Sequence, residues 1–171
     1  MSETDAFLIT FTTYGSWLPG DARGSSERLI RSGSTVSIEP NPDRMRRAQD
    51  KMREQPMTLG VRMRPIVAAA ITEVCTNRGW SLLASNVRTN HVHVVVAGPD
   101  NPVAAMTAFK AWSTRRLREE GLIPNRDRVW TRHGSTRFLY TVRAVAAAVA
   151  YVVEGQGDDL GGTVPPQSEL L

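Results

Sequence analysis

The sequence predicts an α+β fold in which helices cover an antiparallel sheet. Two β-rich stretches, 80–87 and 91–97, are separated by a three-residue polar turn, which is typical of an antiparallel hairpin. Helical patterns lie on both sides of this hairpin along the chain, at 60–78 and 102–120. The one cysteine, Cys75, excludes an internal disulfide framework and a cysteine-based zinc site, so an apolar core must stabilise the 171 residues.

The amino-terminal third is predicted to contain one strand followed by a long insertion. Residues 6–13 are rich in β-forming types. Phe7, Ile9 and Phe11 would share one face of a strand there, as a half-buried strand requires. The stretch 14–24 consists of turn-forming residues, and we expect 25–39 to be an exposed loop because it is polar and has no clear period. Asn41 and the proline after it are a suitable helix start, which predicts a short charged helix over 43–54.

The middle of the chain is predicted to supply a core helix, the hairpin and a second helix. Over 60–78 apolar side chains repeat every four residues, and Gly79 is a suitable C-cap. After the hairpin, a helix is expected over 102–120. Its apolar side is expected to carry Val103, Met106, Phe109 and Leu117.

The carboxyl-terminal part completes the sheet and covers it. A short extended stretch is expected within 122–140, and a last helix over 142–154. The order β, insertion, α, β, β, α, short β, α indicates a ferredoxin-like antiparallel sheet sandwiched by helices. We therefore expect one domain over 1–157, in which 22–58 is an inserted loop and short charged helix, and a flexible acidic tail over 158–171.

Composition excludes a membrane protein and is compatible with a polyanionic partner. No apolar run approaches the roughly 20 residues of a membrane span, and the acidic amino terminus is not a signal peptide, so we expect a cytoplasmic protein. The formal charge is 21 − 17 = +4, and 19 of the 21 basic residues are arginine, whose planar fork suits phosphate oxygens. A GC-rich coding sequence would also favour arginine, so charge alone leaves both interpretations open.

His91 and His93 are the sharpest local signal. Side chains two residues apart in a strand point to the same face, so the two imidazoles would lie side by side while the valines at 92, 94 and 96 face the core. Two such imidazoles can bind one divalent cation. A pair of exposed or hydrogen-bonded strand histidines is the competing interpretation. His133 is the one further histidine, so oxygen or amide ligands would have to complete a metal site.

Tyr151 is the second signal. At about 100° per residue it falls on the far side of the last helix from a valine stripe, among alanines that would let another surface approach closely. Glu154 lies three residues further and shares this side, so both side chains could face a metal held by the histidines. An exposed surface tyrosine would give the same pattern. The stripe consists of Val142, Val145, Val149 and Val152.

This combination of groups suits phosphoryl transfer. A phenol is a weak nucleophile at neutral pH, and a metal that polarises the phosphate and neutralises developing charge compensates for that weakness. A covalent phosphotyrosine preserves the energy of the phosphodiester. The sugar hydroxyl that leaves can later attack and reverse the step, so such an enzyme breaks and rejoins DNA strands.

The sequence resembles the single-tyrosine HUH transposases of small bacterial insertion sequences and their REP-associated relatives. The resemblance begins with Asn90–Val96 (NHVHVVV), followed about 60 residues after the histidines by a helix with one tyrosine. It covers roughly residues 6–157. The further matching segments are Thr12–Asp21 (TTYGSWLPGD), Arg78–Trp80 (RGW), Gly134–Arg137 (GSTR) and Tyr151–Gly157 (YVVEGQG).

The resemblance implies that His91 and His93 are metal ligands, usually for Mg²⁺ or Mn²⁺, and that Tyr151 is the nucleophile. It also implies action on single-stranded DNA, often folded into hairpins, with a 5′-phosphotyrosine intermediate and a free 3′-hydroxyl. A protein that acts on DNA in this way is expected to be nucleoid-associated. Members commonly work as homodimers, in which the tyrosine helix can serve the partner's site.

The third metal ligand departs from the pattern of many relatives. They place an amide four residues after the tyrosine, where this chain has Gly155. Glu154 and Gln156 are therefore the candidates: Glu154 has the better helical geometry, and Gln156 would need the chain to turn back. His133 is a weaker reserve.

Contacts to DNA are predicted at four residues. The counterpart of Lys110 often lies near the site in relatives, and Trp112 and Arg115 share a helix face that could stack on bases and bind phosphate. Arg137, in the Gly-Ser-Thr-Arg turn, is a further candidate for phosphate. Core or dimer packing of Trp112 is the competing interpretation. Tyr14 and Trp17 are expected to brace the loop after the first strand.

Two other functions compete with the nuclease. One is a domesticated relative that binds DNA hairpins without cutting, although such a binder has no need of His91, His93 and Tyr151 together. The other is a ferredoxin-like RNA-binding domain, which would display aromatic side chains on its sheet face. Here the expected strand displays histidines instead, and aromatic residues make up 6% of the chain.

Overall fold

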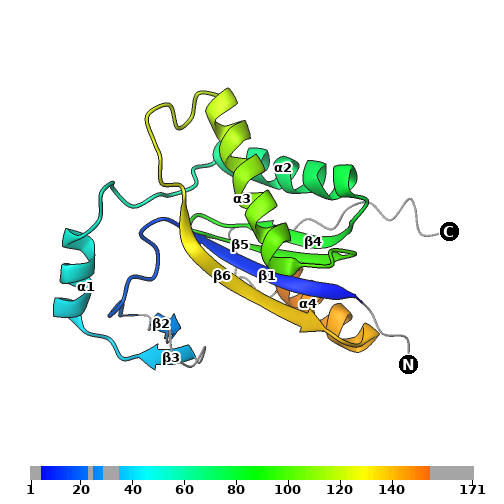
Figure 1. The fold of residues 1–171 in the computed structure, drawn as a ribbon, viewed down its shortest axis with the longest axis horizontal. Helices are drawn as coiled ribbons and strands as arrows, with labels where there is room; N and C mark the ends of the chain where they lie inside the picture. The colour runs from blue at the N-terminus through cyan, green and yellow to red at the C-terminus, as the bar shows by residue number, and fades with distance from the viewer. Residues whose placement is uncertain (1–4, 23–24, 29–34, 155–171) are drawn as a thin grey trace.

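The computed structural model describes residues 5–22, 25–28 and 35–154. Its main body is an antiparallel sheet of four strands in the order β4-β5-β1-β6 (Figure 1). The strands of this sheet are β1 (Ala6–Thr13), β4 (Ser81–Val87), β5 (His91–Ala97) and β6 (Trp130–Leu139). The helices are α1 (Pro42–Asp50), α2 (Met63–Arg78), α3 (Pro102–Glu119) and α4 (Val142–Glu154).

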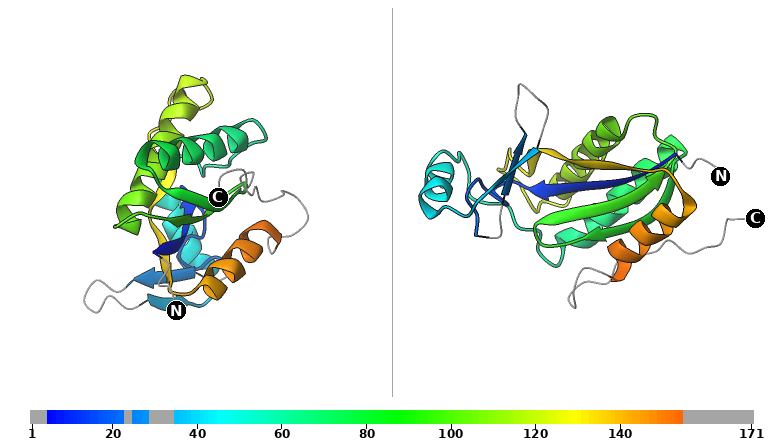
Figure 2. Two further views of the ribbon diagram at one scale, coloured as in Figure 1. Left: turned by 90° about the vertical axis from the view of Figure 1, so that its right-hand side faces the viewer. Right: turned by 90° about the horizontal axis from the view of Figure 1, so that it is seen from below.

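The connectivity matches the ferredoxin-like expectation. Apart from the insertion after β1 and the last helix, the chain runs β1-α2-β4-β5-α3-β6, which is the split βαβ arrangement. α2 and α3 cover one face of the sheet and α4 covers the other (Figure 2). Among the described helices, none combines the length and the apolar character needed to cross a membrane.

Strict alternation along the two central strands separates two apolar layers. Phe7, Ile9 and Phe11 of β1 are buried in the larger layer, which faces α2 and α3, together with the valines at 92, 94 and 96 of β5. The smaller layer faces α4. Because neighbouring side chains on a strand point to opposite faces, both layers follow from the sequence alternation. The smaller layer consists of Ala6, Ala84, Val95, Leu139, Ala148 and Val152.

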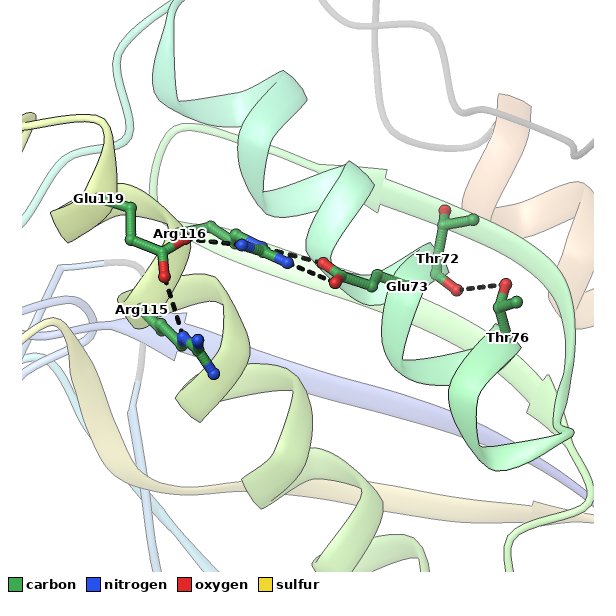
Figure 3. A network of polar contacts seen from close by, with 6 residues as sticks. All are labelled: Thr72, Glu73, Thr76, Arg115, Arg116 and Glu119. Carbon is green, nitrogen blue, oxygen red and sulfur yellow. Dashed lines mark hydrogen bonds and ion pairs between the residues drawn. The ribbon is translucent and has the colours of Figure 1, made fainter.

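A network of ion pairs joins α2 and α3 at the surface (Figure 3). Arg116 donates to both carboxylate oxygens of Glu73 on α2 and, through Nη1, to Glu119 Oε2 at 2.6 Å. Arg115 donates to the other oxygen of Glu119 at 2.9 Å. The hydrogen bonds to Glu73 and Glu119 raise the pKa of Arg116 above its ordinary value. The network thus fixes the charge of Arg116 and the relative placement of the two helices on this face.

The loop between β1 and α1 is held close to that helix by two glycines with positive φ. Gly15 has φ +82° and Gly20 has φ +90°, which L side chains rarely adopt, and a Cβ at Gly20 would overlap the backbone at Asn41. Asn41 caps α1 as predicted, because its side chain accepts a hydrogen bond from Arg44 N at 2.9 Å.

The expectation of a loop over 25–39 was wrong for 25–28 and 35–38, while 29–34 lies outside the described residues. β2 (Ser25–Arg28) and β3 (Thr35–Ile38) form a separate two-stranded antiparallel ladder, with Ser25 paired to Ile38. Four-residue strands are too short to show a reliable period in the sequence, and here backbone pairing defines them. The charged helix is also shorter than expected, since α1 ends at Asp50 rather than Glu54.

Two further expectations differ from the structure in detail, namely the length of β6 and the extent of two apolar helix stripes. β6 spans ten residues, Trp130–Leu139, because it pairs along most of β1 rather than forming a short stretch. Val103 and Val142 are exposed rather than part of the apolar stripes of their helices. Both lie in the first turn of a helix, before the helix reaches the apolar layer that the later residues of each stripe contact. The expected tail, 158–171, lies outside the described residues.

Candidate functional site

A polar row crosses the α4-facing side of the sheet. Strand alternation places His91 and His93 on the same face as Val95, which packs in the smaller apolar layer. The register then sets Thr10 of β1 on one side of His93 and Asn86 of β4 on the other. The row therefore lies directly beside the apolar layer that holds α4.

The two histidine rings are adjacent and each is hydrogen-bonded through Nδ1. Their ring centroids are 4.9 Å apart. Nδ1 of His91 lies 2.7 Å from Asn90 Oδ1, and Nδ1 of His93 lies 2.8 Å from Thr10 Oγ1. Because an amide oxygen only accepts, His91 donates from Nδ1, and its neutral form has its lone pair on Nε2. Such hydrogen bonds orient imidazoles that act as metal ligands.

Tyr151 lies beside His93 at the edge of the α4 interface. Its ring centroid is 5.7 Å from that of His93, at an interplanar angle of 78°. The tyrosine is 48% exposed, whereas His93 is 7% exposed. Ala148 is buried against the sheet, and this small side chain lets α4 approach closely. The surface that packs against the small residues of α4 is thus the sheet of the same chain. Tyr151 lies at the solvent-exposed edge of this interface.

Asn86 is a residue of this region that sequence reasoning missed. It is 2% exposed, and its Nδ2 donates to the backbone carbonyl of Val152 at 2.9 Å. The last carbonyls of a helix have no partner within the helix, so this bond satisfies one of them next to Tyr151. Asn86 Oδ1 is buried and has no partner among the described residues. A polar residue at an inward position of an apolar strand is the signal that could have identified it.

The donor set provides two nitrogen ligands for a metal. Imidazole nitrogens bind divalent first-row cations well, so the His91 and His93 pair fits such an ion. Within the described ranges, no three histidine, cysteine, aspartate or glutamate side chains lie together in a way that could hold one. Glu154, the last residue of α4, is exposed and forms no such group with the histidines, and neither does His133 on β6. Gln156 lies outside the described residues.

The predicted DNA contacts divide between the two faces of the sheet. Arg137 is paired with Leu8, whose side chain packs in the smaller layer, so Arg137 is on the same face as the histidines. Lys110 and Arg115 are on α3, which covers the opposite face. The competing interpretation of Trp112 is confirmed in part, since its ring packs against the larger core.

Lys110 fixes the start of β6 rather than joining the histidines. Its Nζ donates to the backbone carbonyls of Thr131 at 2.9 Å and His133 at 3.1 Å. Burial lowers the pKa of this amine below its ordinary value, because desolvation disfavours the charged form. The described contacts of Lys110 are therefore structural.

Comparison with known proteins identifies the family. The family model described as "Transposase IS200 like" matches residues 49–152, which is more than half of the chain and includes both histidines and Tyr151. The chain belongs to the IS200-like transposase family. No curated protein gives a significant match.

A solved structure supports the fold of this transposase family member. It is described as "Structure of the REP associates tyrosine transposase bound to a REP hairpin", and the two chains superpose with a TM-score of 0.51 at 14% identity. The match covers 89% of this chain and 66% of the solved chain. At this identity the likeness concerns the fold, and it confirms the predicted α+β architecture.

Proposed function

We propose that this IS200-like transposase cuts and rejoins single-stranded DNA through a covalent link to Tyr151. The observation that carries the proposal is the placement of the Tyr151 ring 5.7 Å from His93, which in turn lies 4.9 Å from His91. A nucleophile and two metal-binding groups from β5 and α4 thereby meet at one place. The membership of the family and the hairpin bound to the solved relative support DNA that forms hairpins as the substrate.

The proposed step is an in-line displacement at a DNA phosphate. The phenolic oxygen of Tyr151 forms a bond to phosphorus while the bond between phosphorus and the 3′-oxygen breaks. The phenol loses its proton and the departing 3′-oxygen gains one, so the products are a 5′-phosphotyrosine and a free 3′-hydroxyl. A 3′-hydroxyl that attacks the phosphotyrosine reverses the reaction and releases Tyr151.

A divalent cation, Mg²⁺ or Mn²⁺, is part of the proposal, with His91 and His93 as its nitrogen ligands. It would neutralise charge on the phosphate, as metals do in phosphoryl transfer. Thr10 and Asn90 orient the rings through Nδ1. Glu154 and Gln156 are the candidate third ligands, and single alanine variants of each, compared for Mn²⁺ affinity, distinguish them.

The described geometry favours a site completed within one chain. Tyr151 is next to His93 of its own chain, and Asn86 attaches the end of α4 to the same sheet. The proposal retains a homodimer, in keeping with the resemblance, but assigns both the histidines and the tyrosine of each site to one protomer. Mixed dimers of a Tyr151→Phe chain and a His93→Ala chain test this point: a site within one chain leaves such heterodimers inactive.

The reaction itself is tested by trapping the covalent adduct. The protein is incubated with Mn²⁺ and a 3′-labelled single-stranded hairpin from the flanks of its own gene, because the tyrosine stays on the 5′ end of the labelled fragment. On a denaturing gel we expect a shifted band that EDTA and Tyr151→Phe abolish. Tyr140→Phe is the matched control, since Tyr140 is an exposed tyrosine just before α4.

The possible outcomes separate the candidate functions. An adduct that persists in Tyr151→Phe would overturn the assignment of the nucleophile. Binding of the hairpin without any adduct, in the presence of Mn²⁺, would favour the alternative of a DNA-hairpin-binding protein without cleavage activity.

A further inference from the structure

We propose that Trp17 forms a stacking site for one nucleobase of the bound single strand, next to the histidine pair. This inference rests on the proposed function, because it assumes that the strand passes the site. The Trp17 ring centroid is 5.4 Å from that of His91, with a tilt of 33° between the rings. Trp17 is 37% exposed, so part of its indole surface faces solvent beside the place where the phosphate would bind.

The backbone presents this tryptophan in an unusual way. Trp17 has φ +48°, the one positive φ of a residue other than glycine within the described ranges. A bulky residue in this region is an outlier that the surrounding structure must hold in place. In this conformation the indole of Trp17 lies against the imidazole of His91.

The residues just before Trp17 are anchored to the chain segments that precede β5 and β6. Thr13 N donates to the carbonyl of Asn90 at 2.9 Å, which links the loop to the residue that orients His91. Thr13 Oγ1 is 2.8 Å from Ser16 Oγ, and Tyr14 N donates to the carbonyl of Val129 at 2.8 Å. The indole is therefore preorganised, and a base that stacks on it does not have to order the loop.

The chemistry of an indole beside such a site fits a base better than a phosphate or a sugar. An indole has a large apolar face and no positive charge, and every base has a π-face, so stacking tolerates any sequence. Proteins that hold single strands combine aromatic platforms with positive charge along the backbone. On this side of the sheet, Arg137 is an exposed positive charge and Trp17 an exposed aromatic surface.

The stacking is tested with two probes of equal length and charge. One is a single-stranded 12-mer of thymidine, and the other is a 12-mer of abasic sites. Stacking on a base quenches indole fluorescence, so we expect quenching with the thymidine probe and little with the abasic probe. Trp17→Phe should remove most of this quenching. Trp80→Phe is the control, because Trp80 packs edge-on against Phe109 on the face covered by α2 and α3.

Affinity provides a second readout that a purely structural role would not give. By fluorescence anisotropy of the labelled thymidine probe, Trp17→Ala should bind roughly 5- to 100-fold more weakly, and Trp17→Phe should recover most of the loss. The slope of log affinity against log salt should not change, because the phosphate contacts are retained. Equal urea midpoints for Trp17→Ala and Trp17→Phe establish that both variants are folded.

Three results would overturn the stacking site. They are quenching that survives Trp17→Phe, equal quenching by the abasic probe, and an affinity of Trp17→Ala within twofold of the unaltered protein. None of these touches the proposed function, which stands or fails with the Tyr151 adduct. A chain that forms the adduct but gives any of these results keeps its function and loses the stacking site.

Discussion

Replacing Asn86 should loosen the end of the helix that carries Tyr151. Asn86 is 2% exposed, and its amide donates to the carbonyl of Val152 at 2.9 Å, one residue after the tyrosine. In Asn86→Ala this carbonyl stays buried without a donor, which costs about 1–3 kcal/mol of unfolding free energy. Asn86→Leu loses the same donor but fills the space that alanine would leave as a cavity, so its cost should be smaller.

The assay is urea unfolding of both variants, followed by the rate of adduct formation. We expect the order of stability to be unaltered protein, Asn86→Leu, Asn86→Ala, with a slower adduct in both variants because Tyr151 is less well placed over His93. Asn125→Ala, at an exposed loop residue, is the control and should stay within about 0.5 kcal/mol. An Asn86→Ala variant as stable as this control would refute the assignment of Asn86 as an anchor of α4.

Three further predictions follow from single contacts. Gly134→Ala should cost about 1–3 kcal/mol in urea unfolding, because a Cβ there would overlap the sulfur of Met106 and the carbonyl of Thr10. Burial raises the pKa of Cys75 to about 12 from 9.0, so at pH 8 its alkylation by iodoacetamide should be about 1000-fold slower than in the urea-unfolded chain. Thr10→Val should weaken Mn²⁺ binding about 10- to 100-fold in calorimetry, because His93 loses its Nδ1 partner.

Each of these three predictions has a control variant or a result that would contradict it. Ser135→Ala, the neighbour of Gly134, should be nearly neutral in stability, and an equal loss in both would contradict the overlap argument. The raised pKa of Cys75 also makes the stability of the folded chain depend on pH. The stability associated with its neutral thiol is complete below about pH 9 and is lost as the pH rises toward 12. Rapid alkylation of the folded chain would contradict its burial. Thr107→Val, at an exposed threonine of α3, should leave Mn²⁺ binding unchanged.

Local periodicity determined most of the architecture. Alternation along 91–97 was enough to place the two histidines on one face and the valines at 92, 94 and 96 in the core, because the direction of a strand side chain depends on its own backbone alone. The helical period likewise separated Tyr151 from the buried side of its helix. The order of strands and helices then indicated the fold, since few topologies accommodate it.

The partners of these residues were decided by tertiary structure. Thr10 and Asn86 lie on either side of His93 only because of the register of three strands, and no local pattern specifies which residue lies opposite which. Lys110 proved to belong to the other face, where it holds β6. Trp17 lies beside His91 with a positive backbone φ, a conformation that no pattern in the sequence predicts. The sequence thus determined which side chains are candidates for the chemistry, and only the packing of distant segments decided what orients them.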